Sequence, residues 1–196
     1  MPWWGLLSSS AAPVLLIGGW TLSAAQQPAG FDPLVESISE LAAADAANRE
    51  VMSLALFGVG ICHLVTAIAL RPVPIPARAL LAIGGMATIG VAALPLPSGV
   101  ADSLPHATAA TVALVAIAVW PALAGRHSMP VLRPQLCMGV AAVLLLLVGW
   151  FFVSVVTEAP LSGLSERIAA GAQSAWPFAV VAALRHTSRT AAAAGS

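Results

Sequence analysis

Long apolar stretches separated by short polar gaps run through this chain of 196 residues. A helix needs roughly 20 apolar residues to cross about 30 Å of hydrocarbon, and six stretches approach that length. The predicted spans are residues 3–25, 49–70, 78–94, 105–124, 135–156 and 166–184. The pattern therefore predicts an all-α polytopic membrane protein whose six transmembrane helices form one domain over residues 1–196.

Charged residues separate between alternate gaps of this pattern. The acidic residues lie in or beside the first, third and fifth gaps: Asp32, Glu36, Glu40, Asp45, Glu50, Asp102, Glu158 and Glu166. Most of the arginines flank the second gap, the fourth gap and the tail: Arg71, Arg78, Arg126, Arg133, Arg185 and Arg189. Because basic residues in short loops mark the cytoplasmic face, both termini are predicted to be cytoplasmic. The acidic gaps then face outward, and the expected location is the plasma membrane.

The longest outer gap, residues 26–48, has a pattern of its own. Asp32 is a predicted N-cap followed by Pro33 at the first helical position, an arrangement that helices favour. Apolar residues then recur at helical spacing, with two glutamates on another face: Leu34, Ile38, Leu41, Ala42, and Glu36 and Glu40. This predicts a short amphipathic helix over 32–44 that lies on the outer surface or dips into the mouth of the bundle. Asn48 and Ser165 are the predicted N-caps of the second and sixth spans.

Composition excludes several classes of protein and of site. The chain is 59% hydrophobic and 8% charged, whereas soluble domains are about 25% charged. It has no clustered basic surface of the kind that nucleic acid binding needs. No HxxxH, HExxH or CxxC pattern occurs, so the sequence indicates neither a metal site nor a cofactor. Cys62 and Cys137 lie within apolar segments and are interpreted as buried apolar side chains.

The candidate site residues lie at the outer ends of the predicted spans. His106 is a candidate general base, one helical turn from Asp102; the alternative is a histidine at a helix end that bonds backbone or headgroup. The sixth span carries a polar stripe with Glu166, Arg167 and Gln173, which lipid cannot satisfy and which should therefore face the bundle. The stripe indicates either a ligand cavity that opens outward or a structural set of hydrogen bonds.

Two further groups of residues are candidates for chemistry. Ser39 or Ser37 is a candidate nucleophile with His106 as its base, although neither a GxSxG nor an SxxK motif is present. His63, deeper in the second span, is interpreted as a neutral histidine bonded across the bundle, with a role in a proton path as the alternative. An outer acid such as Asp32 is expected to approach Arg167, since adjacent helical residues such as Glu166 do not face it.

The segments FDPLVESISELAA, GICHLVTAIALRP, HATAATVALVAIAVWP and ERIAAGAQSAWP resemble an uncharacterised family of multi-pass prokaryotic membrane proteins, the domain of unknown function 998. The resemblance covers roughly residues 31–185 and rests on the order and spacing of these segments. Its polar pattern falls on Asp32, Ser39, His63, His106, Glu166, Arg167 and Gln173. ISELAA is also faintly similar to DRAM-type membrane proteins, which are linked to lipid handling. Because the family carries no established reaction, the resemblance implies a fold and the place of a site, but no activity.

Two classes of function follow from these observations. The first is a membrane protein that binds membrane lipids, or a partner membrane protein, in an outward-facing pocket formed by Ser39, Arg167 and Gln173. The second is a membrane enzyme that acts on a lipid headgroup or a lipid-linked substrate, with His106 as base and Asp32 or Glu166 as the orienting or acid group. A small proton-coupled transporter is a third reading, which the expected lack of a buried acid disfavours. The binding class leads because no complete nucleophile or metal set is recognisable.

Overall fold

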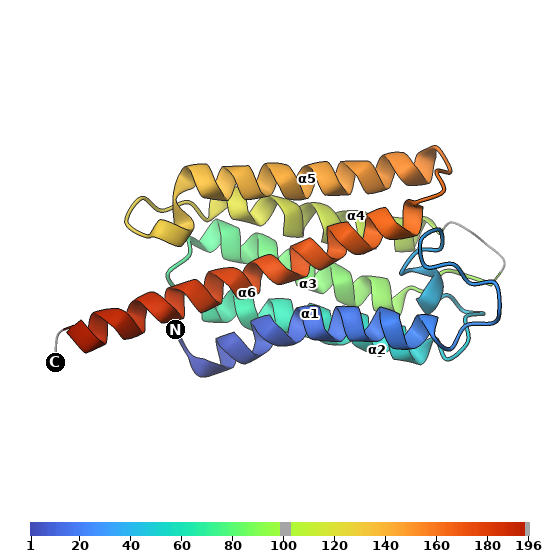
Figure 1. The fold of residues 1–196 in the computed structure, drawn as a ribbon, viewed down its shortest axis with the longest axis horizontal. Helices are drawn as coiled ribbons and strands as arrows, with labels where there is room; N and C mark the ends of the chain where they lie inside the picture. Colours follow the sequence, from blue (N-terminus) through green and yellow to red (C-terminus); the bar gives the residue numbers. More distant parts are fainter. Residues whose placement is uncertain (99–102, 195–196) are drawn as a thin grey trace.

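The computed structural model describes residues 1–98 and 103–194, and these residues confirm the all-α class. Its α-helices are α1 (Trp3–Ala24), α2 (Glu50–Ala69), α3 (Ile75–Ala93), α4 (Leu104–Val119), α5 (Pro134–Val156) and α6 (Ser162–Ala194). Within the described residues, three short 3₁₀ helices lie between them: η1 (Glu40–Ala42), η2 (Trp120–Leu123) and η3 (Pro130–Leu132). Figure 1 shows the long helices side by side, with α6 crossing the others obliquely.

Five of the described helices are long and apolar enough to cross a membrane: α1, α2, α3, α4 together with η2, and α5. They indicate a multi-pass membrane protein. The sixth predicted span falls within α6, which is 33 residues long but is not among the five. Its hydropathy is lower because it carries the polar stripe that begins at Glu166 and includes Gln173.

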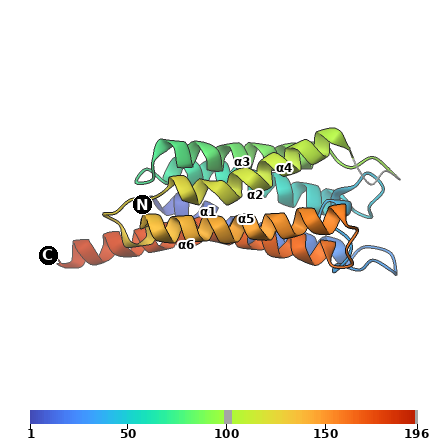
Figure 2. The ribbon, with the colours of Figure 1, turned by 90° about the horizontal axis from the view of Figure 1, so that it is seen from above.

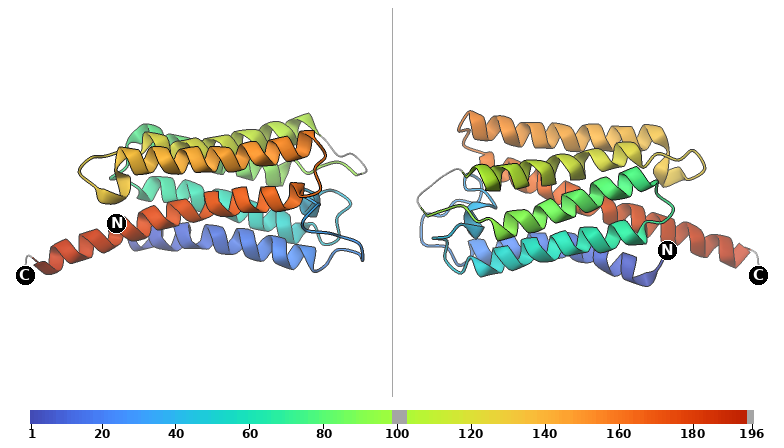
Figure 3. Two further views of the ribbon diagram at one scale, coloured as in Figure 1. Left: turned by 45° about the horizontal axis from the view of Figure 1, so that its top comes forward. Right: turned by 180° about the vertical axis from the view of Figure 1, so that it is seen from behind.

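The connections between helices gather at two ends of the bundle (Figures 1 and 2). One end holds the loop between α1 and α2 together with the turn between α5 and α6; we call it the acidic end, because Asp32, Glu36, Glu40 and Glu158 lie there. The opposite end holds the α2–α3 and α4–α5 connections and both termini (Figure 3). The charges that alternate along the sequence are therefore collected at opposite ends.

Small residues allow the helices to pack closely. A methyl group at Gly60 on α2 would lie 2.6 Å from the carbonyl oxygen of Gly85 on α3, and one at Gly85 would lie 2.8 Å from the carbonyl oxygen of Gly60. At this crossing the two backbones are in direct contact. Small residues have this role in membrane bundles because lipid supplies no hydrophobic force between helices.

The loop between α1 and α2 extends into the bundle at the acidic end. Its residues Ile38, Leu41 and Ala42 are at most 3% exposed and pack with Leu16 of α1 and Met52 of α2 in one apolar cluster. We call residues 31–44 the plug. Burial of each large apolar side chain is worth about 1.5–3 kcal/mol, so this position of the plug is strongly favoured over a loop lying free in water.

The prediction of an amphipathic helix over residues 32–44 is wrong, although its apolar residues are buried. Asp32 caps a single turn, with its Oδ1 accepting from the N–H of Leu34 at 2.9 Å. The carbonyls of Leu34 and Val35 then accept hydrogen bonds from the start of α6, so they do not propagate a helix. Only η1 is helical in this segment.

Both predicted N-caps are also wrong. Asn48 has a positive φ of 48°, and the cap of α2 is Arg49. The sixth helix starts at Ser162 rather than Glu166, so Ser165 lies inside its first turn. The helix begins earlier because its first N–H groups find acceptors in the plug.

Replacing Gly60 or Gly85 by alanine is expected to destabilise the bundle by about 1–3 kcal/mol, the range found for overpacking. The added methyl group would meet the facing backbone, which cannot move aside as a flexible side chain can. Thermal unfolding of the purified protein in detergent should show a lower Tm for both variants. Gly139→Ala is the control, since a methyl group there meets no neighbour within 4 Å. Equal Tm values for all three variants would contradict the close α2–α3 crossing.

Candidate functional site

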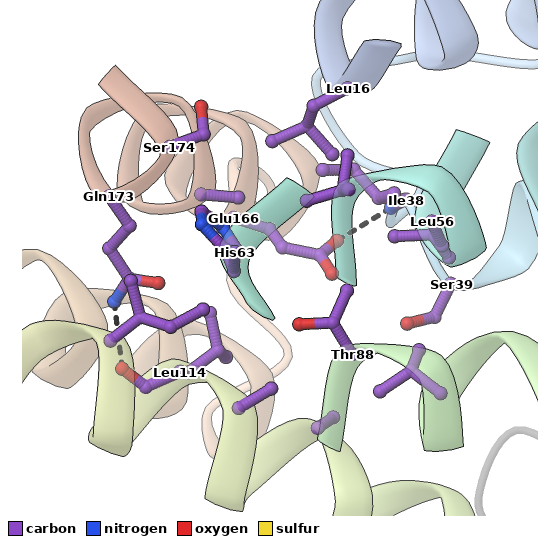
Figure 4. A pocket seen from close by; sticks show the side chains of 16 residues that line it. Leu16, Ile38, Ser39, Leu56, His63, Thr88, Leu114, Glu166, Gln173 and Ser174 are labelled. Carbon is purple, nitrogen blue, oxygen red and sulfur yellow. Dashed lines mark hydrogen bonds between the residues drawn. The ribbon is translucent and has the colours of Figure 1, made fainter. Parts of the chain in front are cut away.

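A cavity of about 70 Å³ lies inside the bundle, next to the plug. Side chains from α1, α2, α3, α4, α6 and the plug line it (Figure 4). Its polar lining residues are Ser39, His63, Thr88, Glu166, Gln173 and Ser174; the apolar lining includes Leu16, Leu56, Val91, Ala113 and Ile117. The site is thus an apolar space with a few polar groups, which is the usual composition of a small-molecule pocket.

Glu166 lies where the plug meets the cavity. Its side chain is buried, and its Oε2 accepts a hydrogen bond of 2.6 Å from the backbone N–H of Ile38. Figure 4 shows the carboxyl group reaching from α6 across the cavity, toward Thr88 and Ser39. The interaction fixes the plug and, at the same time, places a carboxyl group at the cavity wall.

Gln173 lies deeper on the same face of α6. Its Nε2 donates to the carbonyl oxygen of Leu114 on α4 at 2.9 Å. The amide oxygen points into the cavity in Figure 4. Gln173 therefore joins two helices and offers the cavity one acceptor.

His63 is the group in the cavity with an unmet hydrogen-bonding requirement. The residue is 1% exposed, and its Nδ1 has no hydrogen-bond partner among the described residues. A buried polar atom without a partner costs about 1–3 kcal/mol. The predicted bond from His63 across the bundle is not made by this nitrogen, and a polar ligand in the cavity would satisfy it.

The first turn of α6 holds the plug by its backbone. The N–H groups of Gly163 and Leu164 donate to the carbonyls of Val35 and Leu34, each at 3.0 Å. The hydroxyl of Ser162 donates to the same Val35 carbonyl at 2.6 Å. Gly163 is needed here, since a methyl group at this position would collide with the carbonyl oxygen of Glu36.

Arg167 completes this attachment. Its Nη1 donates to the carbonyl oxygens of Pro33 and Glu36, both at 2.7 Å. The predicted approach of outer acids occurs only at longer range: the largest electrostatic interaction of the guanidinium is with the adjacent Glu166, and those with Glu40, Glu36 and Asp32 follow. Within residues 1–98 and 103–194, no carboxylate oxygen forms an ion pair with the guanidinium within 4 Å. The backbone, rather than an acid, is therefore its partner.

His106 and Ser39 form a second polar contact at the acidic end. His106 Nε2 lies 3.0 Å from Ser39 Oγ, and His106 Nδ1 lies 2.7 Å from the carbonyl oxygen of Leu94. A carbonyl only accepts, so Nδ1 carries the proton, and in a neutral imidazole Nε2 then accepts from the serine hydroxyl. The predicted partner Asp102 lies outside the described residues.

The structure thus divides the predicted site residues into three groups. Ser39, Glu166 and Gln173 line the cavity; Arg167 lies beside them and binds the plug; His106 contacts Ser39 without being part of the lining. Asp32 is exposed and serves as a turn cap. Thr88 and the Leu94 carbonyl were not predicted, because the sequence contains no signal for them. The expected lack of a buried acid is wrong, since Glu166 is buried and lines the cavity together with His63.

No metal site is indicated in the described part of the chain, where no three His, Cys, Asp or Glu side chains are close enough to hold an ion. The chemistry that the arrangement offers is hydrogen bonding in the cavity and proton exchange between Ser39 and His106.

Arg167→Ala is expected to loosen the plug, because the carbonyls of Pro33 and Glu36 lose their shared donor. Hydrogen–deuterium exchange of residues 31–44 should become faster by roughly tenfold or more, since hydrogen bonds to a charged group contribute about 1.5–3 kcal/mol. Arg126→Ala is the control, as this side chain is exposed on the α4–α5 connection. Unchanged exchange in Arg167→Ala would show that the side chain does not hold the plug.

The chain has no significant match among curated proteins or among solved structures. A family model does match it, over residues 10–183, which is most of the chain and includes α2 to α5 and the polar part of α6. The resemblance found in the sequence is therefore confirmed, and the chain belongs to the family described as protein of unknown function (DUF998).

Proposed function

We propose that this protein binds the polar end of a small, lipid-derived molecule in the cavity beneath the plug. The observation that carries the proposal is His63, a fully buried side chain in the cavity lining whose Nδ1 has no partner among the described residues. Glu166 and the amide oxygen of Gln173 add acceptors along one wall of the same space. A hydroxyl or amino group attached to an apolar skeleton matches this set.

The size of the cavity limits the ligand. Pockets for small molecules are typically about 300–1,000 Å³, whereas this one is about 70 Å³ with the plug in place. Only a short molecule or one end of a lipid fits without movement of the plug. A lipid is favoured over a partner membrane protein as the occupant, because the cavity lies among helices and not on the surface.

The proposed arrangement in the membrane has six spans. In this arrangement α6 spans the membrane together with the five apolar helices. Its polar stripe is tolerated because Gln173 and Glu166 form hydrogen bonds within the bundle. Both termini then lie in the cytoplasm and the acidic end faces outward, in the plasma membrane. The arginines of the α2–α3 and α4–α5 connections support this orientation.

Filling the cavity is expected to weaken ligand binding. Ala113 of α4 lines the cavity and is 6% exposed, so Ala113→Leu places three extra carbon atoms in it. A steric cost of about 1–3 kcal/mol should lower the fraction of protein that retains a lipid-derived molecule by roughly 5- to 150-fold. Native mass spectrometry of the protein released from detergent micelles measures this fraction.

Ala142→Leu is the matched control for this experiment, since it makes the same change on the exposed face of α5. Wild type and Ala142→Leu should retain the same bound mass. A wild type with no bound mass, or an Ala113→Leu variant that binds as the wild type does, would contradict the proposal.

The orientation is tested by cysteine labelling in a Cys62→Ala, Cys137→Ala background. A cysteine in place of Ser98, which is exposed at the acidic end, should react with an impermeant maleimide on intact cells. A cysteine in place of Ser128, exposed on the α4–α5 connection, should react only after permeabilisation. The reverse pattern would invert the orientation.

A further inference from the structure

We propose that Ser39 and His106 form a nucleophile and general-base pair that hydrolyses carboxylic esters with a short acyl chain. The pair lies at the acidic end, where the plug meets the start of α4. Ser39 also lines the cavity of Glu166, Gln173 and His63, so the two proposals share that space, whereas His106 lies outside its lining.

The orientation of His106 is the one that a general base requires. Its Nδ1–H donates to the Leu94 carbonyl at 2.7 Å, which leaves the lone pair of Nε2 directed at Ser39 Oγ, 3.0 Å away. A nucleophile within hydrogen-bond reach of a base, itself oriented by a third group, is the arrangement that activates a serine. Here the third group is a backbone carbonyl and not a carboxylate.

His106 is held rigidly in this position. The residue is 4% exposed and lies in the first turn of α4. Ser39, in contrast, is half-buried and faces the cavity from the plug. The base is thus shielded, while the serine lines the cavity from which a substrate would approach it.

The surroundings of Ser39 offer two further parts of an ester-hydrolysing site, a donor for the oxyanion and a space for the acyl group. Its own backbone N–H donates to no acceptor in the described part of the chain, and the N–H of the nucleophile is one of the usual oxyanion donors. The apolar cavity beside it would take the acyl group, and its volume of about 70 Å³ limits that group to a short chain.

The reaction proceeds in two steps. Ser39 Oγ attacks the ester carbonyl carbon while its proton moves to His106 Nε2; the carbon–oxygen bond to the alcohol then breaks, and the alcohol leaves with that proton. In the second step His106 takes a proton from water, the resulting hydroxide attacks the acyl-serine, and the serine regains its proton as the carboxylic acid is released. Water is the only co-reactant, and the plug lies at the water-facing end of the bundle.

A fluorophosphonate probe tests the pair directly, because it reacts with an activated serine and releases fluoride. Purified full-length protein in detergent should be labelled, and mass spectrometry should place the adduct on Ser39. Ser39→Ala should abolish the labelling. Ser37→Ala is the matched control: this serine is two residues away, and its Oγ accepts from the N–H of Glu40 rather than contacting His106, so labelling should persist.

His106→Gln separates catalysis from a purely structural contact. Glutamine can still donate to the Leu94 carbonyl, but it cannot take a proton. The labelling rate should fall by roughly 100-fold or more, the usual contribution of a general base, while Tm stays near that of the wild type. No labelling of the wild type, or equal rates in wild type and His106→Gln, would overturn the proposal. Neither outcome depends on ligand retention in Ala113→Leu, so the two proposals fail separately.

Discussion

The backbone hydrogen bonds between the plug and the first turn of α6 are the contacts on which the acidic end depends. A helix that starts near a membrane boundary leaves its first N–H groups without internal partners, and a loop that enters the bundle leaves carbonyls without partners. Each segment supplies what the other lacks: Gly163 and Leu164 donate, and Val35 and Leu34 accept. Arg167 adds a charged donor for two more carbonyls, so this end of the bundle is closed without an ion pair in the contact.

Closure of this end also creates the interior site. With its backbone held by α6, the plug turns Ile38 and Leu41 into the apolar cluster between α1 and α2, and it brings Ser39 to the rim of the cavity. Adjacent plug residues then contact two different groups: the N–H of Ile38 bonds Glu166, and the hydroxyl of Ser39 contacts His106. The same short segment therefore couples the cavity wall on α6 to the start of α4.

The sequence predicted what depends on local pattern and missed what depends on contact between distant segments. Five apolar stretches became the expected long helices, and the stripe with Glu166 and Gln173 does face the bundle, because lipid offers such groups no partner. The helix predicted over residues 32–44 failed because α6 takes the carbonyls that would have propagated it. The partners of Arg167 and of His106 Nδ1 are backbone carbonyls, which every residue has, so no pattern of side chains marks them in advance.

Contacts with the distant plug segment decide the roles of Glu166 and Arg167. Both were candidates for ligand chemistry, yet each forms hydrogen bonds with the backbone of the plug. Glu166 Oε1 remains for a ligand, and further polar groups lie deeper in the cavity lining, at His63, whose Nδ1 has no partner, and at Gln173, whose amide oxygen faces the cavity. A molecule that bonded Glu166 Oε1 would share the carboxylate with the N–H of Ile38, which bonds Oε2. Binding in the cavity and the position of Ser39 relative to His106 are therefore linked through the Glu166 carboxylate and the adjacent plug residues Ile38 and Ser39.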